Sequence, residues 1–341
     1  MQPRRFVRLA LFAASLVLSH ATSAQQPATK EKEWKLSTAV GPAFALGAAG
    51  QRWAKQIDER SGGRLAAKVY PGAALADREP SREFFALANG VADLAVGSSL
   101  SWSTQVPELN VIGLPWIAGE AKALEALIGA ATVRERLDAA IERAGAVPLA
   151  YAPLGVRALA TTAASAQTPD ALKNLKVRVG STPLVADLLI ALGAEPRTLS
   201  FAEAQAAFKS GQLDAQEGTL ATFAAARLDA LGVHHVVLWG ATAEVAVFAV
   251  NRALWGRLSD ADRTIVTESA KETAAELPTL VTAENDTALA ELQKRGVSVT
   301  RLTSSGRAAF GFAARAAYDK WAAQAGADLV RSAEAAVPAT Q

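Results

Sequence analysis

The sequence feature that most constrains the fold is a short pattern that occurs twice. Gly90-Val91-Ala92-Asp93 continues to Gly97, and Gly211-Gln212-Leu213-Asp214 continues to Gly218. Glycine is common just after helices, so one occurrence would indicate only a helix end. The same spacing in two similar contexts predicts two lobes of similar design. A length of 341 residues agrees, because it suits two cores of roughly 150 residues each.

Strand-like and helix-like segments alternate around both copies of the pattern. Strands are expected at residues 34–40, 65–70, 94–97, 156–162 and 176–179, and helices from about residues 45, 79 and 183. Ser200 with Glu203 predicts a capping box, and Ser259 with Asp262 begins a long helical stretch to about residue 295. This order is typical of βαβ units and predicts an α/β fold with a mostly parallel sheet in each lobe.

The N-terminus has the organisation of a secretory signal. Residues 1–24 combine basic Arg4, Arg5 and Arg8, an apolar run over 9–18, and small residues at Thr22 and Ala24. The alternative is a buried N-terminal helix. A transmembrane helix needs about 20 apolar residues, and no segment of the chain provides them. We therefore expect cleavage near Ala24, a polar segment at 25–33, and a periplasmic protein that is not embedded in a membrane.

Composition excludes several functions. The chain contains no cysteine, which excludes disulfides, thiolate metal sites and a thiol nucleophile. Its formal net charge of +2 includes the three arginines of the signal, so the processed chain carries −1 and gives no electrostatic indication of nucleic-acid binding.

The residues of known catalytic motifs are missing. Phosphate-binding glycine loops, a G-x-S-x-G elbow and H-E-x-x-H do not occur. Beyond the signal the only histidines are His234 and His235, whose side chains would point to opposite faces of a strand. The sequence therefore predicts no catalytic residue, no metal site and no cofactor, and an enzyme is not expected.

Two arginines in or beside apolar strands are candidate ligand contacts. Arg178 lies in Lys176-Val177-Arg178-Val179, at the end of a predicted strand, where α/β sheets bind ligands. Its planar guanidinium matches a carboxylate, but a solvated strand arginine is also possible. Arg157 begins the second lobe, where it could contact a ligand or form an ion pair between the lobes.

The chain resembles the DctP-like extracytoplasmic receptors of TRAP transporters from about Trp34 to near Ala336. The matching segments, in order, are Gly62-Gly63-Arg64-Leu65 and Val69-Tyr70-Pro71-Gly72; Asn89-Gly90-Val91-Ala92-Asp93; Pro107-Glu108-Leu109 with Leu114-Pro115-Trp116; Gly155-Val156-Arg157 before Thr161-Thr162; Leu175-Lys176-Val177-Arg178-Val179; and Gly211-Gln212-Leu213-Asp214-Ala215-Gln216-Glu217. Each segment alone is weak, and their common order and spacing carry the resemblance.

The resemblance implies a two-lobed periplasmic-binding-protein (Venus-flytrap) fold with a long helix spanning both lobes. Lobe I is expected at 34–154 plus about 243–283, and lobe II with the C-terminal helices at 155–242 plus about 284–336. Arg178 matches the carboxylate-clamping arginine of the family, and Arg157 matches a second arginine that assists it. Phe201 matches a position that packs on the ligand in sialate receptors.

Other predicted ligand-binding positions depart from the sialate receptors. Gly218 replaces a ligand-contacting asparagine, and Ser98 and Ser101 replace larger polar or charged residues, so sialate is not expected. Glu217 is included in the predicted site, although it could instead fix a turn or pair with a cation. Phe44, Trp102 and Trp116 could form apolar walls, and Trp116 could equally be a core residue.

The resemblance implies a receptor that captures a small organic carboxylate by hinge closure and delivers it to small and large membrane subunits. The expected receptor is monomeric. Two alternatives stay open on the sequence: a sensory binding protein that presents an organic acid to a receptor kinase, and a periplasmic enzyme on the same scaffold.

Overall fold

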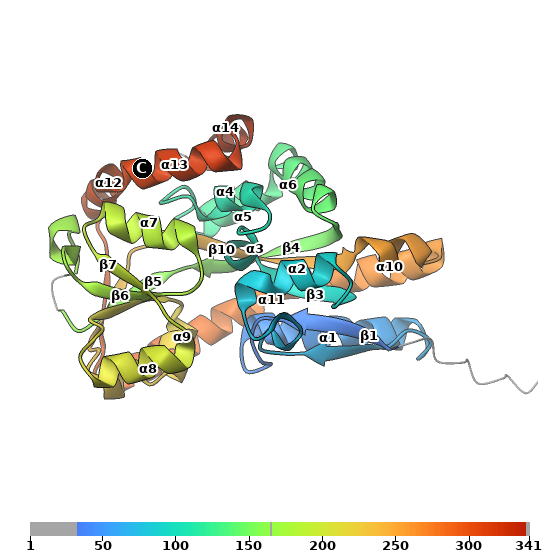
Figure 1. Ribbon diagram of the computed structural model, residues 1–341, viewed down its shortest axis with the longest axis horizontal. Coiled ribbons are helices and arrows are strands. Elements are labelled where there is room, and N and C mark those ends of the chain that lie inside the picture. Colours follow the sequence, from blue (N-terminus) through green and yellow to red (C-terminus); the bar gives the residue numbers. More distant parts are fainter. Residues whose placement is uncertain (1–32, 164–165, 339–341) are drawn as a thin grey trace, which may run out of the picture.

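The computed structural model describes residues 33–163 and 166–338 (Figure 1). The predicted signal at residues 1–24 lies outside this range. The first of two sheets has the strand order β2-β1-β3-β10-β4. Strand β1 is parallel to β2 and β3, whereas β10 is antiparallel to β3 and β4. The bounds are β1 Trp34–Thr38, β2 Ala67–Tyr70, β3 Leu94–Ser98, β4 Ala146–Val156 and β10 Ala243–Asn251.

The second sheet has the order β11-β9-β5-β8-β6-β7. Strand β5 is antiparallel to β8 and β9, and the other pairs are parallel. Both sheets are thus mixed, because the strands that carry the chain between the lobes run against their neighbours. The bounds are β5 Ala158–Thr161, β6 Lys176–Val179, β7 Glu195–Thr198, β8 Ala215–Gly218, β9 His235–Leu238 and β11 Ser298–Arg301.

Helices cover both sheets, as predicted for an α/β fold with two lobes (Figure 1). Those that accompany the first sheet are α1 Ala45–Arg60, α2 Glu83–Ala88, α3 Ser99–Trp102, α4 Asn110–Gly113, α5 Ala121–Gly129, α6 Ala131–Arg143 and α10 Arg252–Arg257. Those that accompany the second are α7 Pro183–Ala191, α8 Phe201–Lys209 and α9 Leu220–Ala225. The long helix is α11 Asp260–Lys294, and α12 Ser304–Ala313, α13 Arg315–Ala325 and α14 Ala327–Ala336 follow it.

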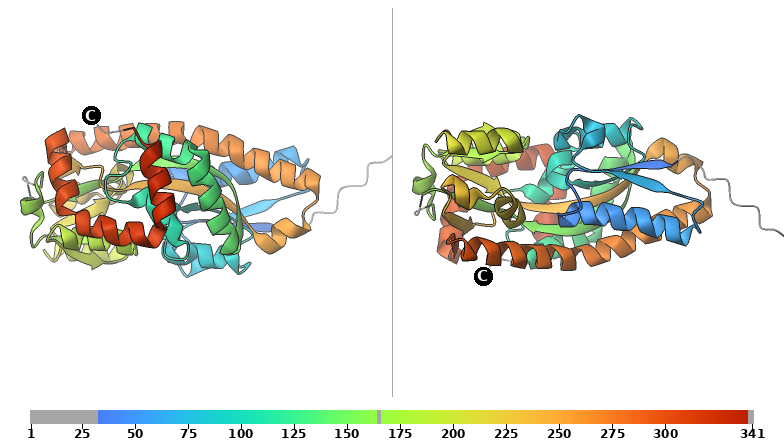
Figure 2. Two further views of the ribbon diagram at one scale, coloured as in Figure 1. Left: turned by 90° about the horizontal axis from the view of Figure 1, so that it is seen from above. Right: turned by 90° about the horizontal axis from the view of Figure 1, so that it is seen from below.

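Helix α11 braces both lobes, as the resemblance implied. Its 35 residues run along the molecule for about 50 Å (Figure 2). It contacts α1 and β4 beside the first sheet, and α9 and β11 beside the second. Ser259 caps its N-terminus by accepting a hydrogen bond from the Asp262 amide, as the sequence predicts.

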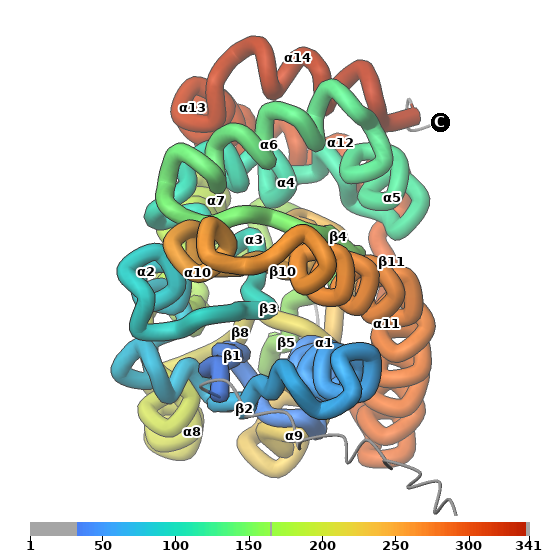
Figure 3. The backbone as a smooth tube through the Cα atoms, turned by 90° about the vertical axis from the view of Figure 1, so that its right-hand side faces the viewer, coloured from blue at the N-terminus to red at the C-terminus, as the bar shows by residue number. Residues whose placement is uncertain are grey.

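The C-terminal helices also lie across both lobes rather than on lobe II alone. Helix α13 packs on α7 of the second lobe and on α4 of the first, and α14 packs on α5 and α6 (Figure 3). One cluster of buried apolar residues accordingly joins Val247 on β10, Val177 on β6 and Phe310 on α12. The two lobes therefore share a core on this side of the molecule.

The repeated sequence pattern has the same structural role in both lobes. Gly90 and Gly211 end helices α2 and α8 with left-handed backbone angles of φ 73° and 70°. The carboxylate of Asp93 accepts a hydrogen bond of 2.9 Å from the Lys35 amide at the start of β1, and Asp214 accepts one of 2.9 Å from the Lys176 amide at the start of β6. Each aspartate thus fixes the register between two parallel strands, which confirms the similar design of the lobes.

One predicted strand is divided in the structure. The stretch predicted as one strand at 156–162 is divided at Arg157, where β4 ends and β5 begins in the other sheet. On the short helix α2, Phe84 and Leu87 are buried and Phe85 is 54% exposed. The capping box predicted for Ser200 and Glu203 is present at the start of α8.

Candidate functional site

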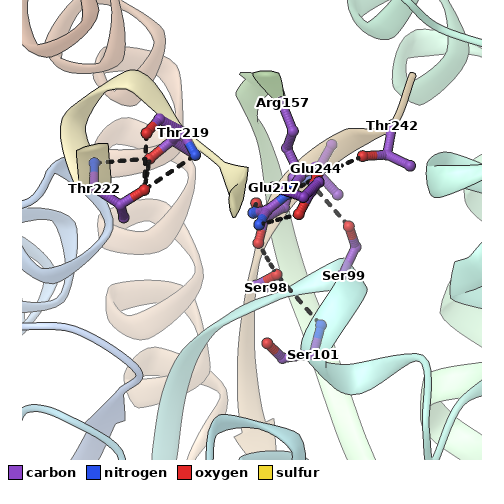
Figure 4. A network of polar contacts seen from close by, with 10 residues as sticks. Ser98, Ser99, Ser101, Arg157, Glu217, Thr219, Thr222, Thr242 and Glu244 are labelled. Carbon is purple, nitrogen blue, oxygen red and sulfur yellow. Dashed lines mark hydrogen bonds and ion pairs between the residues drawn. The ribbon is translucent and has the colours of Figure 1, made fainter. Parts of the chain in front are cut away.

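Arg157 is a charged side chain at the joint between the lobes that forms three hydrogen bonds. It lies between β4 and β5, so its backbone belongs to a segment that passes from one sheet to the other. Its Nε and Nη2 atoms donate to Oε1 and Oε2 of Glu217, at 2.6 and 2.8 Å, and its Nη1 donates to Oε2 of Glu244 at 2.8 Å (Figure 4). All three guanidinium nitrogens are thus bound to carboxylates of the protein.

The two glutamates come from different sheets. Glu217 lies on β8, and Glu244 lies near the start of β10. The pairing of β10 with β4 is shifted between Glu244 and Val245, opposite Gly155 with its φ of 99°. This register shift is a β-bulge, and bulges change the direction of neighbouring side chains. Here the Glu244 carboxylate points toward Arg157.

Two hydroxyl groups complete this polar network. Ser98, at the end of β3, donates to Oε1 of Glu244, and Thr242 donates to Oε1 of Glu217 at 3.2 Å. We call Arg157, Glu217, Glu244, Ser98 and Thr242 the hinge network. It connects the first sheet, through Ser98, with the second sheet, through Glu217.

The hinge network is largely withdrawn from solvent. The side chains of Glu217, Glu244 and Arg157 are 1%, 13% and 18% exposed. Burial alone would lower the pKa of Arg157, but the two carboxylates raise it well above its ordinary value. Arg157 therefore stays charged. The sequence allowed Arg157 either to contact a ligand or to form an ion pair between the lobes, and the structure shows the ion pair.

Arg178 has a different environment. On β6, Val177 and Val179 are buried on one face, and Arg178 is half-buried on the other. Its Nε donates to the Leu199 carbonyl at 3.0 Å, and no carboxylate of residues 33–163 or 166–338 forms a salt bridge with it. Burial is the main cause that lowers its pKa, and the positive charge of Arg157 adds to this, while Glu217 opposes it. Arg178 is therefore within electrostatic reach of the hinge network without being neutralised by an ion pair.

The other predicted positions fall into two groups. Phe201, at the first position of α8, is 42% exposed, and Ser101 on α3 is half-buried, so both are accessible. Gly218 is buried against α9, where an added Cβ would lie 3.0 Å from the Phe223 ring and from the Thr222 hydroxyl. The absence of a side chain at Gly218 thus has a packing reason within lobe II.

Trp102 does not form an exposed apolar wall as the sequence suggested. Its side chain is fully buried, it packs edge-on against Phe84, and its Nε1 donates to the Glu83 carboxylate at 3.2 Å. Glu83 is also fully buried and accepts a 2.7 Å hydrogen bond from Ser37, and burial raises its pKa to about 7. Trp102 and Glu83 belong to the core of the first lobe, so we leave Trp102 out of the candidate site.

Trp116 lies in a different part of the molecule. Its Nε1 donates to the Trp239 carbonyl at 2.9 Å, and its ring stacks on Phe310 with centroids 5.8 Å apart. It lines a groove of about 770 Å³ between α5 and the C-terminal helices, and Arg178 does not contribute to that groove. Trp116 is therefore a half-buried residue that packs against Trp239 and Phe310.

No metal centre or membrane span emerges from the described part of the chain. Residues 33–163 and 166–338 contain no cluster of three or more potential metal-ligating side chains and no helix long and apolar enough to cross a membrane. His234 is exposed, and His235 is the first residue of β9, with its Nδ1 3.5 Å from the Ser298 hydroxyl. Neither histidine contacts the hinge network.

Two α/β lobes, connected by crossing strands and braced by one long helix, are the architecture of hinged solute-binding proteins. Residues 36–325 match the family described as bacterial extracellular solute-binding protein, family 7 (DctP), and the chain belongs to this family. This confirms the resemblance seen in the sequence, the two-lobed fold and the expectation of a binding protein rather than an enzyme.

Individual relatives cover nearly the whole chain. A TRAP periplasmic solute-binding protein from Ralstonia eutropha, solved with bound (S)-2-acetolactate, is 39% identical, has a TM-score of 0.84, and covers 89% of this chain and 98% of its own. A solute-binding protein of Verminephrobacter eiseniae is 26% identical over 84% of this chain and 85% of its own length. The C4-dicarboxylate-binding periplasmic protein of Rhodobacter capsulatus is 24% identical over 89% and 90%.

Sequence reasoning missed Glu244, although a signal for it was present. Glu244 is the one charged residue in the apolar run 241–250. A charge within a buried strand needs a partner, because an unpaired ion is costly to remove from water. That argument would have predicted a buried ion pair involving Glu244, but it could not have identified Arg157 as the partner.

Proposed function

We propose that this protein is the substrate receptor of a TRAP-type uptake system for a small organic carboxylate, and that Arg178 binds the carboxylate group. The family supports a solute-binding role in general terms. The identity of the binding residues and of the membrane partners is our inference.

The observation that carries the proposal is the contrast between the two arginines. Every guanidinium nitrogen of Arg157 donates a hydrogen bond to a protein carboxylate. In Arg178, only Nε donates a hydrogen bond to the protein, and its acceptor is the Leu199 carbonyl. A half-buried arginine without an ion-pair partner is suited to bind an anion, because its Nη atoms can donate charge-assisted hydrogen bonds to a carboxylate. Phe201 and Ser101, both accessible, complete the proposed site.

The relative with 39% identity suggests the size of the ligand. Acetolactate, which that protein was solved with, is a short monocarboxylate with a hydroxyl and a keto group. Three of the positions that the sequence predicts to bind ligand carry small residues, with serine at 98 and 101 and glycine at 218. We therefore propose short hydroxy or keto acids as the first ligands to test.

The proposed mechanism is closure of the two lobes on the ligand. The segments at residues 155–157 and 239–242 pass between the sheets and are natural hinges. Closure would bring residues of the first lobe toward Arg178, exclude water and create the form that the small and large membrane subunits read. In this proposal residues 1–24 direct export to the periplasm and are removed.

Calorimetry with a panel of short organic acids that includes (S)-2-acetolactate tests the proposal. Arg178→Ala should weaken binding by about 30-fold to several thousand-fold, equivalent to roughly 2 to 5 kcal/mol, because the ligand carboxylate would be desolvated without a partner. Arg178→Lys should restore only part of the affinity, because a point charge cannot reproduce the planar fork. Small-angle scattering of the wild type should show a smaller radius of gyration with ligand.

Arg197→Ala is the matched control. Arg197 lies beside Arg178 on the neighbouring strand β7, is exposed, and pairs with Glu195 at 2.8 Å. Its loss removes the same charge from the same sheet and should leave affinity nearly unchanged. Wild-type affinity in a folded Arg178→Ala protein would refute the site, and a panel without any bound acid would refute the ligand class.

A further inference from the structure

We infer that Glu244 restricts the proposed site to ligands with a single carboxylate and disfavours dicarboxylates. The inference rests on the proposed function, because it concerns the same ligand and the same arginine. It assigns to Glu244 a role in specificity that neither the family nor any relative described above indicates.

Three charged side chains meet at the joint between the lobes, Arg157, Glu217 and Glu244. Glu217 alone would neutralise Arg157, since it forms a two-bond ion pair with it at 2.6 and 2.8 Å. Glu244 adds a second carboxylate to the same cation, so the hinge network has a net formal charge of one negative. Arg178 on β6 lies opposite Gln216, the residue next to Glu217 on the neighbouring strand β8. It is the one cation near the network without a carboxylate partner among the described residues.

The negative charge of Glu244 is held in place. One of its carboxylate oxygens accepts from Arg157 and the other accepts from the Ser98 hydroxyl, and the side chain is only 13% exposed. Glu244 cannot turn away from an approaching ligand without breaking both contacts. Because it is shielded from water, its field is screened less than that of a surface carboxylate.

The consequence for the ligand follows from this arrangement. The first carboxylate of a ligand compensates Arg178, after which the joint as a whole is negative. A second carboxylate on a short carbon chain would lie near the first, within reach of the network's negative field, and no further unpaired cation is present near the network in the described residues to receive it. A hydroxyl, keto or amide group at the same place meets no such repulsion. The site thus disfavours dicarboxylates because the negative charge of Glu244 repels their second carboxylate.

Matched ligands isolate the effect of charge from that of shape. Succinate and its monoamide, succinamate, have nearly the same size and differ by one negative charge, and malonate and malonamate form a shorter pair. Calorimetry at pH 7 should show the monoamide of the better-binding pair bound at least about tenfold more tightly by the wild type. Glu244→Gln should reduce this ratio by about threefold to tenfold, because glutamine removes the charge. Its amide oxygen can still accept from Arg157, and its amide nitrogen can donate to the Ser98 hydroxyl oxygen.

Glu276→Gln is the control for net charge. Glu276 lies on α11, is 40% exposed and pairs with Arg52 on α1, and its replacement removes one negative charge far from the hinge network. It should leave the ratio unchanged. Thermal unfolding of each variant shows whether it is folded.

Two results would overturn the inference. One is a wild-type protein that binds dicarboxylates as tightly as their monoamides, a measurement that needs no variant. The other is a folded Glu244→Gln protein in which no dicarboxylate gains affinity relative to its monoamide. Neither result would affect the proposed function, which fails only if no carboxylate binds or if Arg178→Ala binds normally.

Discussion

Replacing Arg157 with alanine tests the view that this residue holds the joint together rather than binding ligand. The change would leave Glu217 with only the Thr242 hydroxyl and Glu244 with only the Ser98 hydroxyl. Their side chains are 1% and 13% exposed, so water cannot fully compensate for the lost cation. Removing one partner of a buried ion pair costs about 3 to 5 kcal/mol, and here two carboxylates lose the same partner. We therefore expect the unfolding free energy at pH 7 to fall by about 3 to 5 kcal/mol.

Urea unfolding followed by tryptophan fluorescence measures this loss. Arg52→Ala is the control, because Arg52 and Glu276 form an ion pair with side chains 44% and 40% exposed, and such surface pairs contribute about 0 to 1 kcal/mol. In the Arg157→Ala background, adding Glu217→Gln and Glu244→Gln should recover part of the stability, since it removes the uncompensated charges. A loss no larger than that of Arg52→Ala, or no recovery by the glutamines, would refute the reasoning.

Two further predictions concern a buried carboxyl and export. Glu83 has a native pKa raised to about 7 from 4.5, so between about pH 5 and 7 the native protein retains a proton that the unfolded chain releases, and stability falls as pH rises through this window. Glu83→Gln should flatten that fall and raise the unfolding free energy at neutral pH by about 3 kcal/mol, and parallel pH profiles of variant and wild type would contradict this. The intact mass of protein recovered from the periplasm should correspond to a start at or close to Gln25, and recovery of the full-length chain in the membrane fraction would argue against export.

Local order along the chain was accessible from the sequence. The capping box at Ser200 and Glu203 depends on residues three positions apart, and the structure contains it. Strand β6 occupies the predicted residues Lys176–Val179. The alternation of basic residues with valine over these four positions is sufficient to predict a strand. The repeated glycine and aspartate pattern indicated two similar lobes, although its physical role, an aspartate bonded to the amide of a neighbouring strand, became visible only in the fold.

The partners of buried polar groups were decided by tertiary structure alone. Arg157 is separated from Glu217 by 60 positions and from Glu244 by 87, and no local pattern states which strands will bring their side chains together. For the same reason the sequence did not indicate that Trp102 is buried, because its hydrogen-bond partner Glu83 lies on another helix. Sequence determined which segments form helices and strands, because periodicity and capping act over a few residues. The charge balance at the joint between the lobes depends on distances across two sheets, and only packing sets those distances.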